Sequence, residues 1–379
     1  MRRQGEGVAR GSAFSAGARR MTSAWYFSSS PSARNGRASA AAQAANYPFC
    51  TIEPNVGDVA VPEPRLDALA AIAGSKEIIP ARINFVDVAG LVRGASKGEG
   101  LGNQFLANIR DCDAVAFVAR CFVDDDITHV EGRIDPISDL DIIETELMLA
   151  DLESLEKRVV NLEKRAKGGD KESITTLRLV KLALAQLNAG RPAFTAEVPK
   201  EDDKAWRMLQ LLTAKPALYV CNVDEASADK GNELSDAVAA RAAKDGADSV
   251  VISAKIDSEI ALLAADERAE FLETLGLEEP GLNRLIRQAY HLLGLQTYFT
   301  VGPKEARAWT IHVGDTAPQS AGVIHTDFEK GFIRAETIAY DDYVRLKGEA
   351  GAREAGRMRL EGKDYVVQDG DVMHFRFNT

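Results

Sequence analysis

Short apolar runs that end in polar or glycine-rich loops recur along the chain. Residues 81–88 (ARINFVDV) and 113–122 (DAVAFVARCF) have the pattern of buried parallel strands. Between them, a glycine-rich loop is followed by Phe105, Leu106 and Ile109, which fall at helical spacing. The order strand, loop, helix, strand predicts an α/β domain.

A helical pattern interrupts this order between about residues 139 and 188. Apolar residues step by three and four along two stretches, and KGGDKE at 167–172 supplies a glycine turn between them. This pattern predicts an antiparallel helical hairpin with a charged outer face. The apolar stripe is typical of a packing seam between two helices rather than of a cofactor site.

The α/β pattern then returns, with strands predicted at 216–225 and 248–256 and a helix at 232–246 between them. The hairpin is therefore inserted into one α/β domain. After Gly294, the runs YFTVG, ARAWTIHVGD, GVIHTDF, GFIRAETI and YVVQDGDVMHFRF predict short strands of a small mixed β domain. The predicted domains are the α/β domain at 46–128 and 206–293, the helical domain at 129–205 and the C-terminal domain at 294–379.

The composition fits a globular protein: the chain has 379 residues, of which 45% are hydrophobic and 27% charged. A net charge of -11 argues against nucleic-acid binding over the whole surface, so an RNA contact would have to be local, and we expect no DNA partner. The four cysteines are scattered without CxxC spacing, which favours neither a zinc site nor a disulfide framework. No apolar run approaches the length that crosses a bilayer, so no membrane contact is expected.

The first 45 residues differ from the rest. They contain seven arginines and one acidic residue, Glu6, among many serines, alanines and glycines. Such a segment is expected to be disordered or aberrant. Its composition is also that of an organelle transit peptide, which would place the protein in mitochondria, whereas a mis-assigned start leaves a cytoplasmic protein.

Polar signatures follow three of the predicted strands, where ligands bind in an open parallel sheet. Asp87 is a carboxylate that can hold Mg²⁺ through water, and Gly90 lets a backbone N–H approach a terminal phosphate. The stretch 222–225 (NVDE) stands where guanine-specific enzymes carry Asn-Lys-x-Asp. Valine in place of lysine and glutamate in place of aspartate favour adenine. Residues 253–255 (SAK) would flank a purine.

Each signature alone also fits an ordinary capped loop, but three on successive strand ends favour a nucleotide site. Together with NYPFCTIEPN (46–55), DVAGLVRGASKGEGLGNQFL (87–106), RCFVDDDITHVEGRIDP (120–136) and LEGKDYVVQDGDVMHFRFN (360–378), they make residues 46–379 resemble the YchF (Obg-like) ribosome-binding ATPase family. The resemblance implies an α/β fold: a P-loop G domain with a mostly parallel sheet, an inserted helical hairpin and a C-terminal ubiquitin-like β-grasp (TGS) domain. It also implies Mg²⁺, ATP in preference to GTP, association with the large ribosomal subunit, and RNA contact through the helical and TGS domains.

The resemblance assigns roles to particular residues. It implies that Thr51 and Asp87 bind Mg²⁺, that Gly90 contacts the γ-phosphate, and that the adenine is held by Asn222, Val223, Glu225, Ser253, Ala254 and Lys255. Leu91 stands where many GTPases have a glutamine, and leucine cannot align a water molecule. His129, in the loop DDDITHVEG, is therefore the candidate catalytic residue, the alternative being a surface-loop histidine.

One expected part is missing. The motif GxxxxGK[ST], whose backbone amides, lysine and hydroxyl hold the phosphates and Mg²⁺, does not occur, and residues 28–45 (SSSPSARNGRASAAAQAA) stand in its place. Without it the triphosphate loses charge-assisted contacts, so hydrolysis should be severely impaired. Loss of the strand that precedes this loop should also expose a central position of the sheet. Two functions remain open: an ATP-driven ribosome-associated switch, or a ribosome- or RNA-binding module that does not hydrolyse ATP.

Overall fold

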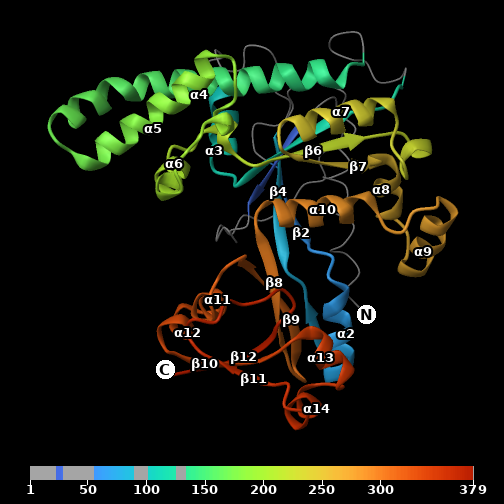
Figure 1. Cartoon of the computed structure of the whole chain (residues 1–379). Helices are drawn as coiled ribbons and strands as arrows, with labels where there is room; N and C mark the ends of the chain where they lie inside the picture. The colour runs from blue at the N-terminus through green and yellow to red at the C-terminus, as the bar shows by residue number, and fades with distance from the viewer. Residues whose placement is uncertain (1–22, 29–54, 89–100, 125–133, 379) are drawn as a thin grey trace. The chain divides into compact units, whose positions relative to one another are not determined.

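The computed structural model describes residues 23–28, 55–88, 101–124 and 134–378 (Figure 1). The chain divides into two compact units. Unit 1 comprises Met1–Gly57 and Asn84–Leu285, and unit 2 comprises Asp58–Ile83 and Ile286–Thr379. Residues 58–83 thus group with the C-terminal unit, whereas we had assigned them to the first part of the α/β domain.

The sheet of unit 1 has six strands in the order β2-β4-β1-β5-β6-β7. Strands β5, β6 and β7 are parallel to one another, and β4 runs in the same direction because β1 is antiparallel to both β4 and β5. The strands are β2 (Asn55–Ala60), β4 (Arg82–Val88), β1 (Ser23–Ser28), β5 (Ala114–Arg120), β6 (Ala217–Asn222) and β7 (Asp248–Ile252). The mostly parallel sheet predicted from the sequence is confirmed.

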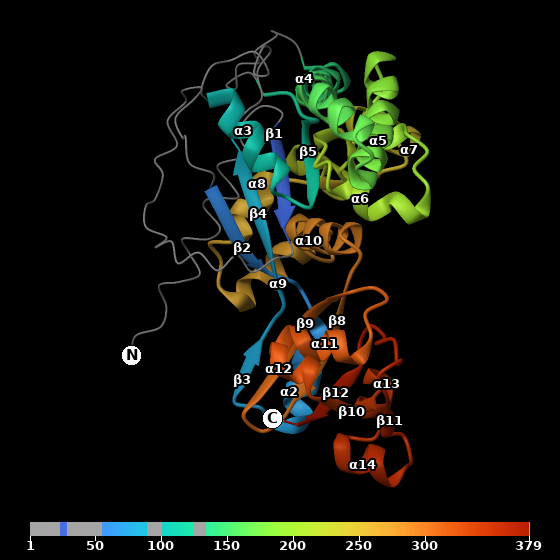
Figure 2. The same cartoon turned by 90° about the vertical axis from the view of Figure 1, so that its left-hand side faces the viewer.

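Strand β1 corrects one prediction. We expected a central sheet position to be exposed, but residues 23–28 of the arginine-rich N-terminal segment fill the position between β4 and β5, with five residue pairs on each side. Figure 2 shows β1 between these strands with the opposite direction. The run SAWYFS is rich in aromatic residues that favour strands, and a gap between two strands offers unpaired backbone groups on both sides.

The helices of unit 1 follow the predicted order, with one change at the end of β7. Residues 254–256 were predicted to continue the strand, but they begin helix α8, whose N-cap is Ser253. The helices are α3 (Leu101–Arg110), α7 (Glu233–Lys244), α8 (Ala254–Ile260), α9 (Ala265–Thr274) and α10 (Gly281–Leu292), the last of which continues into unit 2.

The helical hairpin forms as predicted. Helix α4 (Pro136–Lys167) and helix α5 (Lys171–Asn188) pack against each other and are joined by a turn in which Gly169 has a φ of 86°. The first half of α4 joins the core of the sheet through Leu140, Ile143 and Leu147. Its second half packs in a separate core with α5 and Trp206 of the short helix α6 (Asp203–Arg207).

Unit 2 contains a second six-stranded sheet, in the order β11-β10-β12-β8-β9-β3. The last strand, β12, lies parallel to β8, which forms an antiparallel hairpin with β9. A hairpin, a helix and a last strand inserted beside the first are the arrangement of a β-grasp. The strands are β3 (Glu77–Ile79), β8 (Leu295–Val301), β9 (Glu305–His312), β10 (Phe332–Ile338), β11 (Arg359–Glu361) and β12 (Val372–Phe377).

Residues 322–328 (GVIHTDF), which we predicted as a strand of this sheet, are mostly helical instead. They span the end of α11 (Ala317–Ile324) and the start of α12 (Thr326–Lys330). Helix α11 begins at a capping box formed by Thr316 and Gln319, outside the short apolar run on which the prediction rested. The other helices of unit 2 are α2 (Pro64–Ala73), α13 (Tyr340–Arg345) and α14 (Glu349–Glu354).

Candidate nucleotide site

Two parallel strands bring the predicted base-binding residues together. The Oδ1 atom of Asn222, the last residue of β6, accepts a hydrogen bond of 3.0 Å from the backbone N–H of Ala254. The backbone N–H of Val223 donates to the carbonyl oxygen of Ile252 at 2.9 Å. Because Asn222 and Val223 are buried, these bonds fix the end of β6 against the start of α8. The signatures NVDE and SAK therefore lie next to each other in the structure.

Glu225 and Lys255 form an ion pair across this site. Glu225 opens the 3₁₀ turn η5 (Glu225–Ser227), which Asp224 caps by accepting a 2.9 Å hydrogen bond from the N–H of Ser227. The Lys255 ammonium lowers the pKa of the Glu225 carboxyl, and that carboxylate raises the pKa of Lys255. The site thus presents a charged acceptor beside a charged donor.

Ser253 contributes a buried hydroxyl to the same place. It is the N-cap of α8, but its side chain makes no capping hydrogen bond, and its Oγ atom has no partner within the described residues. A buried polar atom without a partner is unfavourable by about 1–3 kcal/mol. The hydroxyl therefore fits a site that is completed by a polar ligand.

Close to Ser253 in helix α8 lies a buried carboxyl that the sequence did not single out. Asp257, one turn after Ser253, faces the first residues of α10, and burial raises its pKa to about 6 despite the nearby amides of Gly281 and Leu282 and the charge of Arg284. Neither oxygen has hydrogen-bond geometry to a partner within the described residues. Arg284 in turn donates to the carbonyl oxygen of Val251 at 2.9 Å. This group connects α8, β7 and α10.

Arg120 is a second residue that the sequence analysis did not use, although it lies in the quoted motif RCFVDDDITHVEG. It is the last residue of β5, lies beside Asn222 in the sheet and is only 3% exposed. Its guanidinium donates to the carbonyl oxygens of Phe122 at 3.2 Å and Asp124 at 3.0 Å, and burial lowers its pKa. Arg120 thereby holds the start of the loop that leads to His129.

The phosphate side of the predicted site is described only in part. The backbone of β4 brings Asp87 to the penultimate residue of the strand, paired with Trp25 of β1. Thr51, Gly90 and His129 lie outside the described residues, so their assigned roles stay predictions. Within the described residues, no group of three or more His, Cys, Asp or Glu side chains is placed to hold a metal ion.

The direction of β1 bears on phosphate binding. Its last residue, Ser28, pairs with Asn84 at the start of β4, and the preceding Phe27 pairs with Ala114 at the start of β5. Ser28, where β1 ends, therefore lies at the opposite ends of the strands from Asp87 and Asn222. In a P-loop protein the first strand runs parallel to its neighbours, so that its following loop lies at the ligand edge. Strand β1 has the opposite direction, so its last residue lies away from Asp87 and Asn222.

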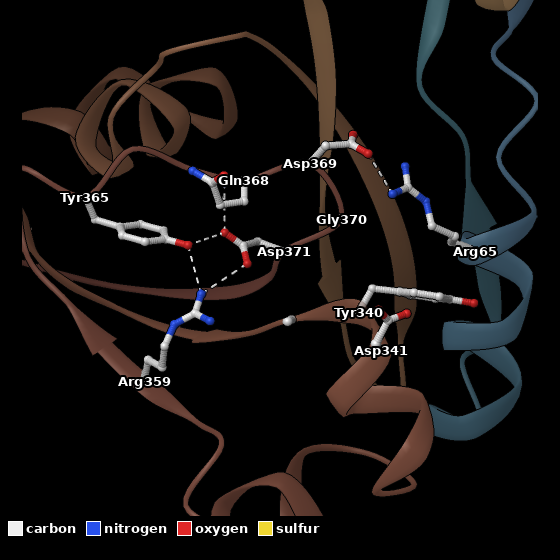
Figure 3. Close-up of a pocket in the computed structure, with 10 residues that line it drawn as sticks. Arg65, Tyr340, Asp341, Arg359, Tyr365, Gln368, Asp369, Gly370 and Asp371 are labelled. Atoms are coloured by element: carbon white, nitrogen blue, oxygen red, sulfur yellow. Dashed lines mark hydrogen bonds and ion pairs between the residues drawn. The ribbon is translucent and has the colours of Figure 1, made fainter.

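Unit 2 has a polar pocket of about 600 Å³, shown in Figure 3. Arg65 pairs with Asp369 at 2.7 Å, and the hydroxyl of Tyr365 donates to Asp371 at 2.6 Å. Asp371 also lies 3.3 Å from the guanidinium of Arg359. Since both arginines in the lining are already paired with carboxylates, we assign these contacts to holding the loop at 365–371 in place.

No helix in the described ranges is both long enough and apolar enough to span a bilayer. The arginine-rich stretch near 353–363, a possible RNA contact, is partly neutralised: Arg353 pairs with Glu349 and Arg359 pairs with Glu361. This pattern is typical of a solvated mixed-charge face.

Comparisons with known proteins point to the same family along most of the chain. The model for the YchF GTPase C-terminal domain, described as a protein of unknown function, matches residues 295–378. A model described as a 50S ribosome-binding GTPase matches residues 33–164, which begins inside the N-terminal segment that we expected to be aberrant.

Among curated proteins, the ribosome-binding ATPase YchF of Pasteurella multocida is 58% identical over 345 residues, covering 91% of this chain and 95% of that protein. Its Bacillus subtilis counterpart is 51% identical over 347 residues, with the same coverage of 91% and 95%. The structure of the Schizosaccharomyces pombe YchF GTPase superposes with a TM-score of 0.74 at 35% identity, covering 88% of this chain and 90% of that one. Matches of this identity and extent mean that the chain belongs to the YchF family.

Proposed function

We propose that this protein is a ribosome-associated ATPase of the YchF type, a nucleotide-dependent switch that binds the large ribosomal subunit and acts in translation or stress response. The proposal rests on the relatives, which are named ribosome-binding ATPases, and on the match of residues 33–164 to a 50S ribosome-binding GTPase. Ribosome association would place the protein in the cytoplasm, or in mitochondria if residues 1–45 are a transit peptide.

The nucleotide part of this proposal rests on the ion pair of Glu225 and Lys255, next to the contact between Asn222 and Ala254. Adenine presents a donor, its amino group, next to an acceptor, its ring nitrogen N1. The carboxylate of Glu225 can accept from the amino group, and the ammonium of Lys255 can donate to N1. Guanine carries an acceptor and a donor in the reversed order at the same two positions, so the ion pair favours ATP over GTP. Asn222, Val223, Ser253 and Ala254 would form the wall beside the base.

For the phosphates, the proposal assigns Mg²⁺ to Thr51 and Asp87, a γ-phosphate contact to the amide of Gly90, and the orientation of the attacking water to His129. A bound Mg²⁺ would neutralise charge on the phosphate oxygens. Arg120 would act as a positioning residue, because it holds the loop that leads to His129 from the end of β5.

This protein should hydrolyse ATP poorly. It lacks the phosphate-loop motif, and each lost charge-assisted hydrogen bond is worth about 1.5–3 kcal/mol. The direction of β1 supports the same conclusion independently of the motif. It also supports a second candidate function, in which the protein binds ribosomes or RNA through its helical hairpin and C-terminal domain without hydrolysing ATP.

Thermal unfolding with and without Mg-ATP distinguishes these functions. A ligand that binds only the folded state stabilises it by RT ln(1 + [L]/Kd), about 2.7 kcal/mol at a hundredfold excess over Kd. A switch driven by ATP requires a clear rise in the Tm of this chain, whereas the second function, which the missing phosphate loop favours, predicts little change in Tm. We expect a clear rise for a matched chimera in which residues 1–40 are replaced by the N-terminal segment of the Pasteurella multocida relative. An equal rise for both proteins would contradict the proposed loss of phosphate binding, and no rise for either would contradict the base site.

A further inference from the structure

We propose that the pocket of unit 2 shown in Figure 3 binds a small organic cation of the polyamine class, which carries two or more ammonium groups. We call it the cation pocket. It is lined by Arg65 of α2, by the start of α13, by Arg359 of β11 and by the loop at 365–371. All of these residues belong to unit 2, so the inference does not depend on nucleotide binding in unit 1.

One side of the pocket is built around Arg65. Its guanidinium pairs with Glu63 at 2.6 Å and with Asp369 at 2.7 Å, so two carboxylates share one cation. Asp369 has a second contact, because it also accepts a hydrogen bond of 3.0 Å from the backbone N–H of Thr297. Gly370 has a φ of 90°, and a Cβ atom there would lie 2.9 Å from Nη1 of Arg65, so a glycine lets the backbone approach the guanidinium. This side of the pocket is therefore preformed, as ligand pockets usually are.

The other side of the pocket is built around Arg359. Its guanidinium lies 2.9 Å from Glu361 and 3.3 Å from Asp371, so two carboxylates again share one cation. Asp371 is buried and also accepts hydrogen bonds from the hydroxyl of Tyr365 at 2.6 Å and from the backbone N–H of Gln368 at 3.0 Å. An anion bound here would meet two carboxylates for each guanidinium, so the pocket disfavours anionic ligands.

Asp341 adds a carboxylate that is not used within the protein. It lines the pocket and is exposed, and no ion pair or hydrogen bond of its side chain is found in the part of the chain that the structure describes. The next residue, Asp342, pairs with Arg345. The helix dipole favours acids in the first turn of α13, but only Asp341 of these two lines the pocket. In and around the pocket, five carboxylates thus stand against two guanidiniums, an excess of three negative charges that a cationic ligand can neutralise.

The size of the pocket and the spacing of its carboxylates favour an organic cation over a metal ion. The volume of about 600 Å³ lies within the range of about 300–1,000 Å³ that is typical of small-molecule sites. Among the described residues, no three His, Cys, Asp or Glu side chains are grouped so that they could hold a metal ion. Spaced negative charges instead suit a flexible chain with several ammonium groups.

Aromatic rings add to the attraction for such a cation. Tyr340 and Tyr365 both line the pocket, and the face of an aromatic ring attracts an ammonium group. Figure 3 shows Tyr340 and Asp341 next to each other at the start of α13, apart from the dashed contacts of Asp369 and Asp371. A ring beside an unpaired carboxylate is therefore available to a ligand without breaking an existing ion pair.

The test measures the binding of spermidine to the full chain by isothermal titration calorimetry at low salt, where exposed charges are screened least. Asp341→Lys places an ammonium group in the pocket. The matched control is Glu354→Lys, which changes an exposed acid of α14 that lies outside the lining and has no ion pair among the described residues. Both variants change the net charge by the same amount, so the control measures the general attraction of an acidic protein for a polycation. Tyr340→Leu removes one ring, and circular dichroism checks that every variant is folded.

We expect saturable binding of one spermidine per chain. Asp341→Lys removes an attraction and adds a repulsion, so Kd should rise about tenfold or more, whereas Glu354→Lys should raise it less than about twofold. Loss of the ring in Tyr340→Leu should raise Kd about two- to fivefold. Equal weakening by the two lysine variants, or binding that does not saturate, would overturn the inference, because spermidine would then follow net charge alone. So would binding of a tetralysine peptide without binding of spermidine, which would assign the pocket to a basic segment of a protein.

Discussion

The buried carboxylate of Asp151 gives the sharpest test of how the hairpin is attached to the rest of unit 1. It lies on α4, is fully buried, and accepts hydrogen bonds from the backbone N–H of Leu212 at 2.9 Å, the backbone N–H of Thr213 at 2.9 Å and the hydroxyl of Thr213 at 2.8 Å. Arg110, the last residue of α3, lies 3.8 Å away. Burial raises the pKa of Asp151, while these donors and the arginine oppose that rise.

The substitution Asp151→Ala leaves two backbone amides without an acceptor, and the hydroxyl of Thr213 can rotate to another partner. Each unsatisfied buried donor costs about 1–3 kcal/mol. Removing the carboxylate also removes its own desolvation penalty, which offsets part of this loss. Because removing one partner of a buried charged group typically costs about 3–5 kcal/mol, we expect a loss near 3 kcal/mol. Thr213→Val removes one donor to Asp151 and also the acceptor of the buried Ala193 N–H, so it should cost about 1–3 kcal/mol.

The assay is urea unfolding followed by the fluorescence of Trp206, which lies in the hairpin core together with Leu211. The other two tryptophans, Trp25 and Trp309, are replaced by phenylalanine in every protein compared. Glu153→Ala, an exposed change on the same helix, serves as the matched control and should leave the midpoint unchanged. A loss below about 1 kcal/mol for Asp151→Ala would refute the reasoning, because it would mean that the freed amides find other acceptors.

Three further predictions concern the sheet and the base site. Tyr26→Pro should lower Tm by several degrees, whereas Tyr26→Val should not, because a proline in a strand that is paired on both sides removes a backbone hydrogen bond of the sheet. Equal Tm values for the two variants would contradict the pairing of β1 with β4 and β5. For Asp257, the pKa is about 6 in the folded protein and 3.8 ordinarily, so the folded state holds the extra proton between these values and stability should fall by about 3 kcal/mol as pH rises through that window. Asp257→Asn should abolish this fall, and a pH profile that keeps it would assign the proton elsewhere. Asn222→Ala should lower Tm by removing the acceptor of the Ala254 N–H, at a cost of about 1–3 kcal/mol, and no change in Tm would mean that this amide is satisfied otherwise.

The parts of the fold that depend on long periodic patterns were predicted well. The hairpin shows an apolar residue every three or four positions over two stretches, as expected for helices that bury one face. Strands β4, β5 and β6 are short apolar runs, as expected for strands that are buried on both faces of a sheet. The errors fell on short segments. GVIHTDF is apolar enough for either a strand or a helix, and only the capping box at Thr316 decides in favour of a helix.

The candidate site shows the same division. The strand ends NVDE and SAK were predictable because ligand sites in parallel sheets lie where strands end, and Asn222 does meet Ala254 there. Asp257 and Arg120 were not predictable, since nothing in their neighbours along the sequence marks them as buried. Their roles arise from contacts with residues that fold against them, Arg284 in one case and the loop after β5 in the other.

Strand β1 explains how the sheet can form without the usual first strand, and its direction is one basis for proposing that phosphate binding is weak. A central gap between β4 and β5 leaves two rows of backbone groups unpaired, and an aromatic-rich segment that fits there satisfies both rows whichever way it runs. Backbone hydrogen bonding therefore requires a strand in the gap between β4 and β5, but it does not determine the direction of that strand. Phosphate binding does constrain direction, because the loop must leave the strand at the edge where Asp87 and Asn222 lie. A complete sheet does not by itself provide a phosphate site, so we expect stability and ATP hydrolysis to separate experimentally.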